Sequence, residues 1–580
     1  MPSTRRTFVR SATSGALATS LLGAGTASTA AARAGVSSTV DATGGTPGSV
    51  DPEERRRLIA KAVFGHKQPA EGKGGMVICA HPLATRAGTD VLRADGNAAD
   101  AALAASVTQT VVEPHMTGIT GVLSTLYFDA ATGTTSYVNG GMNRPMAELK
   151  GWGPEATSTG LGCGVPGFWA GYEATRERFG SRPSRELCAA AIAYARDGFE
   201  VHPFLYGEMF TMASTLGQSE QGREIYFPGG ALLDPGRMLY QRRAADTLER
   251  LVEEGNDYFY RGDFARRYCE VVQQAGGVMT PEDFERYDVR LDEPARGSYR
   301  GYELVGSPLP DHGGTHLIEI LQMIELLDVG KLGPVTESPE LLWQMARICQ
   351  QVFADGGRHR DPKYHPVPLE LIVSKQYART RFELLQMDAP LEQTPSPAPG
   401  SCHVTAVDAR GNVATILHSC MSLPWSNGLF TEGVAIFASG AHFFRVMPGP
   451  GERASVYVAP NMILKDGRPI LASGSPSGSL LQNITQNVTN MLDHGMGIEE
   501  STNRPRFGNA YSAGGGMFLA AEADFPRATV DAVNERGLGM QIVNPANFGM
   551  GSFEAIWIDP ETGVREACGD RRRCAMAEAV

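Results

Sequence analysis

A turn made of glycine and serine precedes one of the clearest helical patterns in the chain. The turn spans residues 474–479, and the apolar residues that follow, from Leu480 to Leu492, recur on one helical face. The first turn of a helix carries backbone N–H groups without helical partners and the positive end of the helix dipole. Such a site can hold an anion, including the oxyanion that forms when a nucleophile attacks a carbonyl group. Turns of this composition also serve as plain connections, so the turn alone leaves both interpretations open.

Cysteine and histidine are the other residue types here that could do chemistry. The nine cysteines include no CxxC pair, and the twelve histidines are dispersed without an HExxH pattern. The spacing that builds zinc sites is therefore missing, and the sequence predicts no metal and no cofactor. Cys568 and Cys574 are close enough in sequence to pair in an oxidising compartment, and two free thiols fit the sequence equally well.

Two predicted hairpins would position the residues around the turn. Alternating runs at 403–408 and 413–418 flank a Gly411-Asn412 turn. A second pair of runs, 460–465 and 469–472, surrounds an Asp-Gly turn and leads directly into the glycine and serine turn. The sequence therefore predicts that a strand, a turn and a helix follow one another there.

Helices are predicted before these hairpins. Residues 94–112 are mostly small, which indicates a closely packed helix, and residues 338–353 combine a Ser-Pro-Glu start signal with a stripe of period 3.6. A proline-rich stretch at 394–400 offers no regular structure and marks the strongest internal boundary.

The overall composition is that of a globular protein. The 580 residues are 42% hydrophobic and 20% charged. The formal net charge is -12, and the sequence shows no basic face that would bind phosphates, so we expect no nucleic-acid partner. The compact basic run Arg571 to Arg573 is interpreted as a solvated surface tract. Beyond the N-terminal run, no stretch approaches the roughly 18 apolar residues of a spanning helix, so no membrane span is expected.

The N-terminus has the pattern of an export signal. Arg5-Arg6 precede a mildly apolar run from Ser11 to Leu22, and residues 1–34 resemble a twin-arginine signal segment. Residues 35–51 are rich in Gly, Ser, Thr and Pro and are predicted to be a flexible linker. We therefore expect an exported protein, extracellular or associated with the cell wall, or a cytoplasmic one if the signal is not used.

A series of short motifs follows one another from residue 76 to residue 508. They are Ala80-His81-Pro82, Asp95-Gly96-Asn97-Ala98-Ala99-Asp100, Val112-Glu113-Pro114, Val165-Pro166-Gly167, Gly276-Gly277-Val278-Met279-Thr280 with Asp283, His403 with Asp408 and Gly411-Asn412, Gly474-Ser475-Pro476, and Asn503-Arg504-Pro505-Arg506-Phe507. In this order the motifs resemble those of the gamma-glutamyltransferase family of N-terminal-nucleophile hydrolases.

The resemblance implies a fold and a maturation step. The fold would be a four-layer αββα sandwich built from both fragments of a self-cleaved precursor, a large one at 52–400 and a small one at 401–580 that form a heterodimer. Cleavage would fall between Gly400 and Ser401, because Ser401 stands where the family has its nucleophilic threonine. The freed α-amino group of Ser401, with a reference pKa of about 7.7–8.0, would be the general base. Cys402 remains an alternative nucleophile, shifted by one residue.

Two further catalytic positions carry over from the resemblance. Ser419 matches the family residue that steadies the nucleophile, and Ser477-Gly478 match the glycine pair whose backbone N–H groups form the oxyanion hole. Since the donors are backbone groups, serine in place of the first glycine does not abolish the hole. Strain is expected if that position requires a positive φ angle.

The family's glutamate pocket does not carry over. Gly141 and Met142 stand where the family has the Arg-Glu clamp for the substrate carboxylate. Met421 replaces an asparagine, Ala441 beside His442 replaces the aspartate that holds the substrate amino group, and Val456 and Tyr457 replace paired serines. Loss of these partners would weaken binding of a charged glutamate head by several kcal/mol.

Together these features predict a self-cleaving hydrolase whose small-molecule substrate is not an ordinary gamma-glutamyl amide. The bond cleaved would lie next to a carbonyl: an amide, as in an exported acylase for a peptide or β-lactam, or a carbon-carbon bond, as in relatives from antibiotic biosynthesis. An ordinary glutathione hydrolase is a further alternative. A non-catalytic binding protein that kept the fold is another, supported by Cys402 and Ser477.

Overall fold

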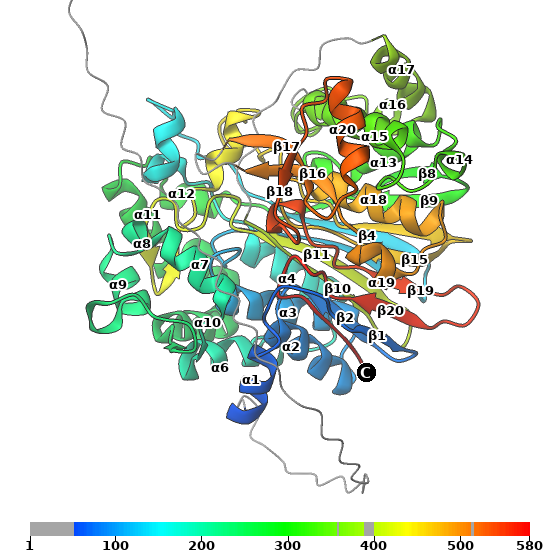
Figure 1. Ribbon diagram of the computed structural model, residues 1–580. Coiled ribbons are helices and arrows are strands. Elements are labelled where there is room, and N and C mark those ends of the chain that lie inside the picture. Colours follow the sequence, from blue (N-terminus) through cyan, green and yellow to red (C-terminus); the bar gives the residue numbers. More distant parts are fainter. Residues whose placement is uncertain (1–50, 357–358, 388–399, 512–515) are drawn as a thin grey trace, which may run out of the picture. The chain divides into compact units, whose positions relative to one another are not determined.

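The computed structural model describes residues 51–356, 359–387, 400–511 and 516–580 (Figure 1). The predicted signal segment, most of the linker and most of the proline-rich stretch before Gly400 lie outside the described residues. The described residues all belong to one compact unit. Its first helix, α1 (Pro52–Ile59), starts with Asp51, whose side chain accepts a hydrogen bond from the backbone N–H of Glu53.

Two antiparallel sheets of seven strands form the centre of this unit. The first sheet has the order β1 (Pro69–Gly72), β20 (Arg565–Cys568), β19 (Ile556–Ile558), β15 (Arg468–Ser473), β14 (Asn461–Lys465), β9 (Tyr302–Gly306) and β8 (Ala295–Tyr299). The second has the order β21 (Met576–Ala579), β2 (Met76–Cys79), β10 (Cys402–Val407), β11 (Val413–Ser419), β3 (Val122–Asp129), β4 (Thr134–Gly140) and β7 (Arg290–Asp292). Strands from both sides of the predicted cleavage point therefore share each sheet.

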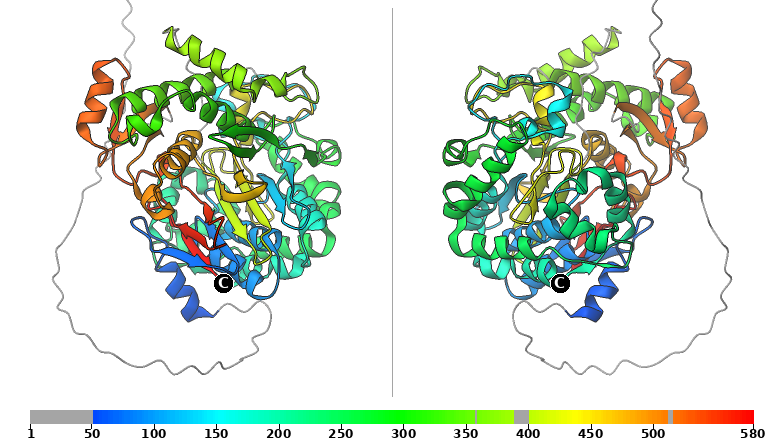
Figure 2. Two further views of the ribbon diagram at one scale, coloured as in Figure 1. Left: turned by 90° about the vertical axis from the view of Figure 1, so that its right-hand side faces the viewer. Right: turned by 90° about the vertical axis from the view of Figure 1, so that its left-hand side faces the viewer.

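Helices cover the outer face of each sheet, and Figure 2 shows the resulting layers. Helices α2 (Pro82–Arg93), α3 (Ala98–Val112) and α4 (Phe168–Phe179) lie on the second sheet, and α6 (Ala189–Asp197), α10 (Arg242–Asn256) and α11 (Asp263–Gln274) belong to the same apolar core. Helix α13 (His312–Ile324) lies on the first sheet, and α15 (Pro339–Gly356), α17 (Lys375–Gln386), α18 (Leu480–Leu492) and α20 (Arg527–Glu535) belong to its apolar core. A third apolar core, with Met76, Leu126, Val407 and Met462, lies between the two sheets. The predicted four-layer αββα sandwich is confirmed.

Local patterns predicted the central elements well. The hairpins are β10 with β11, where Val407 pairs with Val413, and β14 with β15, where Lys465 pairs with Arg468. The small-residue helix is α3, which begins with a capping box between Asn97 and Asp100. These predictions are confirmed, because alternation and turn chemistry act over a few residues.

The prediction for the basic run is wrong. Arg572 and Arg573 are fully buried, and Arg572 forms ion pairs with Glu522 and Asp570, which are also buried. The carboxylates come from distant sequence positions or the opposite side of a turn, so charge composition alone could not reveal them.

Cys568 and Cys574 are buried free thiols. Within the described ranges, no helix has the length and apolar character required to cross a membrane.

Candidate active site

The site begins with a hydrogen-bonded group of three residues around the predicted cleavage point. The Ser401 hydroxyl lies 2.9 Å from the Ser419 hydroxyl and 2.8 Å from the carbonyl oxygen of Gly400. The Ser419 hydroxyl also contacts that carbonyl oxygen closely and accepts a hydrogen bond from the backbone N–H of Met421 at 2.9 Å. Each hydroxyl has one proton to donate. The consistent arrangement is that Ser401 donates to Ser419, and Ser419 donates to Gly400.

The β10–β11 hairpin brings these groups together. Cys402 pairs with His418, so Ser401 and Ser419 lie opposite each other one residue further along the two strands. Gly400 occupies a tight position, because a Cβ atom there would lie 2.3 Å from Cys420 Sγ and 2.7 Å from the carbonyl oxygen of Ser422. Only glycine leaves room for the Gly400 carbonyl at this point.

Cys402 points into the protein rather than toward the cleavage point. Its side chain is fully buried, and its thiol donates to a carboxylate oxygen of Glu113 at 3.3 Å. Burial and the neighbouring Glu113 raise the pKa of the Cys402 thiol well above its usual range. The thiolate form that a nucleophile requires is therefore disfavoured.

The glycine and serine turn lies at the same end of the sandwich as Ser401. Gly474, where the turn starts, packs so closely on the His403 ring that a Cβ atom would lie 2.0 Å from its Cε1 atom. Ser477 has φ of 91°, the left-handed region that favours glycine. Its hydroxyl donates to the carbonyl of Gly549 at 3.1 Å and accepts from the N–H of Ser479 at 3.1 Å. The expectation of strain is therefore met, and two hydrogen bonds hold the serine in place.

Gly478 also requires the absence of a side chain. A Cβ atom there would lie 1.8 Å from the hydroxyl of Tyr511 in β16 (Phe507–Tyr511). The side-chain amide of Asn509 donates to the Gly478 carbonyl at 3.2 Å, which fixes the orientation of this peptide. The backbone at 477–478 is thus held rigidly at the start of α18.

The structure brings most of the predicted pocket residues together. Met421 and Val456 belong to one apolar cluster with Phe443 of the 3₁₀ helix η5 (Ser439–Phe444), which also carries Ala441 and His442. Met142, next to Gly141, belongs to the same cluster, and its carbonyl accepts from the N–H of Ala454 at 2.9 Å. These residues, which come from distant parts of the sequence, therefore meet in or beside one buried apolar cluster.

Arg453 occupies the space beside Gly141, a feature that sequence reasoning missed. A Cβ atom on Gly141 would lie 3.0 Å from Arg453 Cδ. The buried guanidinium donates to Asn139, to Asn143 and to the carbonyl of Asp288 at 2.6–2.9 Å. These neutral oxygens use most of its donors, so Arg453 holds the pocket wall together instead of replacing the missing clamp.

Tyr457 does not face the pocket as an open platform. Its ring stacks on Phe353 at 4.8 Å between centroids, the Arg445 guanidinium lies 4.0 Å from its centroid, and 8% of the residue is exposed. These neighbours already enclose the ring, so Tyr457 offers little surface to an acyl group. His442 is also buried, and burial lowers its pKa to about 3, so this ring is neutral.

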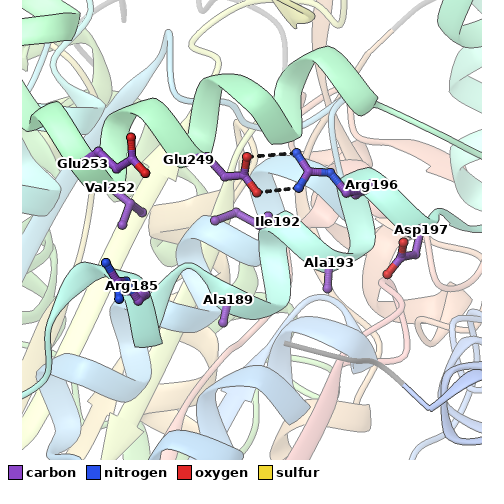
Figure 3. Close-up of a pocket in the computed structure, with 9 residues that line it drawn as sticks. All are labelled: Arg185, Ala189, Ile192, Ala193, Arg196, Asp197, Glu249, Val252 and Glu253. Carbon is purple, nitrogen blue, oxygen red and sulfur yellow. Dashed lines mark hydrogen bonds and ion pairs between the residues drawn. The ribbon is translucent and has the colours of Figure 1, made fainter. Parts of the chain in front are cut away.

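A surface cavity of about 400 Å³ lies elsewhere, between α6 and α10 (Figure 3). Its lining includes the Arg196–Glu249 ion pair and Ile192. None of the residues proposed for catalysis or for the acyl pocket lines it. This cavity is therefore separate from the candidate active site.

Sequence reasoning also missed a group of three histidines behind the pocket wall. His312 and His316 lie on α13, and His359 follows α15. The four-residue spacing of His312 and His316 was a usable signal, because it places both side chains on one face of a helix. No sequence pattern linked His359 to that pair.

The Ser401 hydroxyl lies beside the preceding carbonyl at the start of a central strand, and a rigid turn lies at the same end of the αββα sandwich. This is the arrangement of an N-terminal-nucleophile hydrolase. The sequence profile described as Gamma-glutamyltranspeptidase matches residues 84–580. The chain therefore belongs to the gamma-glutamyltranspeptidase family, a family of enzymes, as a divergent member.

Individual relatives agree with this assignment. The chain is 33% identical to the Acylase ACY 1 proenzyme of Pseudomonas sp. (strain SE83), over 81% of this chain and 88% of the relative. It is 27% identical to the Glutathione hydrolase proenzyme of Bacillus subtilis (strain 168), over 90% and 94%. Among solved structures, cephalosporin acylase from Bacillus halodurans superimposes with a TM-score of 0.79 at 25% identity, over 89% of this chain and 98% of the other.

Proposed function

We propose that this chain is a proenzyme that cleaves itself between Gly400 and Ser401, and that the mature enzyme hydrolyses an amide whose acyl group is not gamma-glutamyl. The observation that carries the proposal is the group formed by Ser401, Ser419 and the Gly400 carbonyl. The names of the two relatives called proenzymes support a maturation step of this kind.

Self-cleavage would start with attack of the Ser401 oxygen on the carbonyl carbon of Gly400. The hydroxyl proton of Ser401 passes to the Ser419 oxygen while Ser419 passes its own proton to the Gly400 oxygen, on which negative charge develops during the attack. The C–N bond then breaks, the nitrogen of Ser401 takes up the proton from the Gly400 oxygen, and Gly400 is left as an ester on the Ser401 oxygen. Water hydrolyses this ester, which leaves a carboxylate on Gly400 and a free amino group and hydroxyl on Ser401.

In the mature enzyme, the amino group of Ser401 would be the general base for its own hydroxyl. The hydroxyl attacks the substrate carbonyl, and the backbone N–H groups at Ser477 and Gly478 stabilise the oxyanion. The amine leaves, and water releases the acyl group from Ser401. Cys402 is not the nucleophile in this account, because its thiol is buried against Glu113.

The pocket favours an acyl group with little charge. Gly141 has no side chain for a carboxylate, and Ala441 has none for an ammonium group. Met421 and Val456 have apolar side chains in the buried cluster, so neither supplies a polar partner. A charged glutamate head would lose its hydration without gaining partners. The relatives named acylases support an amide over a carbon-carbon bond, and an N-acyl peptide or a β-lactam side-chain amide is the substrate class that we propose.

Two assays test this proposal in sequence. The Ser401→Ala variant should remain a single chain, while the matched Cys402→Ala variant should still be cleaved. The cleaved wild type should then hydrolyse N-acyl amides with apolar acyl groups far better than glutathione. Family-typical hydrolysis of glutathione would refute the account of the pocket, and turnover of β-diketones but no amides would assign carbon-carbon cleavage instead. A cleaved protein without any hydrolysis would indicate a binding protein.

We also propose export through the twin-arginine route. The support is the Arg5-Arg6 pair ahead of the apolar run from Ser11 to Leu22. Replacing both arginines with lysine should retain the protein inside the producing cell, while the wild type is recovered outside it. Unchanged export of the double variant would contradict this proposal.

A further inference from the structure

Three histidine side chains meet directly behind the pocket wall. The possible ligand atoms of His312, His316 and His359 all lie within 4.8 Å of one another. Among the residues that the structure describes, this is the one group of three or more His, Cys, Asp or Glu side chains with that geometry. His312 and His316 are fully buried, and His359 is half-buried.

The distances within this group suit a metal ion. Nε2 of His316 and Nδ1 of His359 are 3.3 Å apart. Two nitrogens bound to a tetrahedral zinc ion at about 2.0–2.1 Å lie about 3.3 Å from each other, so this pair already has the required spacing. The possible ligand atom of His312 lies within 4.8 Å of those of the other two rings, so this ring must move closer for all three to bind one ion.

Unpartnered nitrogen atoms provide a second, independent observation. Neither Nδ1 nor Nε2 of His312 has a hydrogen-bond partner among the described residues, and the same holds for Nδ1 of His316. A buried polar atom without a partner loses its hydration with nothing in return, and such atoms are rare unless something binds them. A metal ion on His312 would resolve part of this deficit.

The charge state of the rings also suits metal binding. Burial and neighbouring positive groups lower the pKa of both His312 and His316, so both rings are neutral at pH 7 and keep a lone pair for a metal. Arg445 opposes a cation, because its guanidinium is close enough to lower the pKa of both rings. We therefore expect weaker binding than at a three-histidine site without a nearby positive charge.

We propose that His312, His316 and His359 form a binding site for one zinc ion, which braces the pocket wall at Val456 and Tyr457. The backbone N–H of His312 donates to the Val456 carbonyl at 2.8 Å. The ring centroids of His312 and His316 each lie 5.5 Å from that of Tyr457. A bound ion would tie α13 to the segment after α15 across this wall. Three protein ligands leave a fourth tetrahedral position for water. Neither self-cleavage nor the proposed hydrolysis uses this ion.

The test is zinc binding to the full-length protein after removal of metals with a chelator. Calorimetric titration with zinc chloride should give one equivalent per precursor, or per heterodimer once the chain is cleaved. His359→Ala and His316→Gln should each weaken the apparent affinity by at least about a hundredfold, because each removes a direct ligand. His66→Ala is the matched control, since His66 is exposed and lies outside the group, and its zinc binding should equal that of the wild type.

A second measurement guards against misfolded variants. Cobalt(II) in place of zinc should give the visible absorption of a four-coordinate ion in the wild type and in His66→Ala but not in His359→Ala, whose half-buried position tolerates alanine. Zinc should likewise raise the melting temperature of the first two proteins only. If the wild type does not bind zinc, the proposal is overturned. The contact between His316 and His359 is then explained by a hydrogen bond alone. Unchanged binding in both cluster variants would overturn it as well.

Discussion

Replacing Ser419 with alanine separates the rate of self-cleavage from the stability of the fold. In the wild type, the Ser419 hydroxyl accepts from the Ser401 hydroxyl and from the N–H of Met421, and it donates to the Gly400 carbonyl. Alanine removes all three hydrogen bonds. Their consequences differ, because only some of them change strength during the reaction.

The donated bond controls the rate. Negative charge grows on the Gly400 oxygen as Ser401 attacks, and loss of one donor to such an oxyanion raises the barrier by about 3–4 kcal/mol, or on the order of 10²–10³ in rate. The bond from Met421 contributes to stability instead. A buried N–H left without an acceptor costs about 1–3 kcal/mol, but the cost is the same in the precursor and in the transition state, so it does not slow cleavage.

Cell-free synthesis followed by timed sampling on denaturing gels would measure this rate. Ser419→Thr keeps a hydroxyl and should restore most of the cleavage that Ser419→Ala loses. Cys420→Ala is a comparison variant: the Cys420 thiol donates a longer hydrogen bond to the same carbonyl oxygen at 3.5 Å, so its loss should slow cleavage less than loss of the Ser419 hydroxyl. Cleavage of Ser419→Ala within about tenfold of the wild-type rate would refute the role assigned to this hydroxyl.

Two further predictions concern the pocket and a buried carboxyl group. Gly141→Arg should not create glutathione hydrolysis, because the new Cβ would lie 3.0 Å from Arg453 Cδ and the new charge would face an existing guanidinium. If a kinetic assay shows that this variant hydrolyses glutathione, the clamp position is wrongly assigned. Burial raises the pKa of Asp311 from 3.8 to about 7, so the folded state holds a proton that the unfolded chain releases, and the stability from this group falls as pH rises from about 4 to 7. Asp311→Asn should therefore become more stable than the wild type by a few kcal/mol at pH 8, with little difference near pH 4, as measured by urea denaturation; a difference that does not change with pH would contradict the raised pKa.

The sequence was sufficient for features that depend on neighbouring residues. The β10–β11 hairpin was predicted from alternation and a Gly-Asn turn, and its register then places Ser401 opposite Ser419. Strain at Ser477 was expected on the condition that the position requires a positive φ, and its φ of 91° meets that condition. Each of these inferences spans a short stretch of chain.

Features that depend on distant segments could not be predicted in this way. Arg453 fills the space beside Gly141 through contacts with Asn139 and Asn143, more than three hundred residues away in the chain. Tyr457 is enclosed by Phe353 and Arg445, so a residue that the sequence places in the substrate pocket is part of the core. Such contacts follow from the packing of layers, which no local pattern encodes.

The intact masses of the purified protein under denaturing conditions test the central claim most directly. The account predicts two chains, with the smaller one spanning residues 401–580 and beginning at Ser401, and a single chain for Ser401→Ala. A wild-type protein that stays in one piece while it is active, or a small chain that begins at Cys402, would contradict the account.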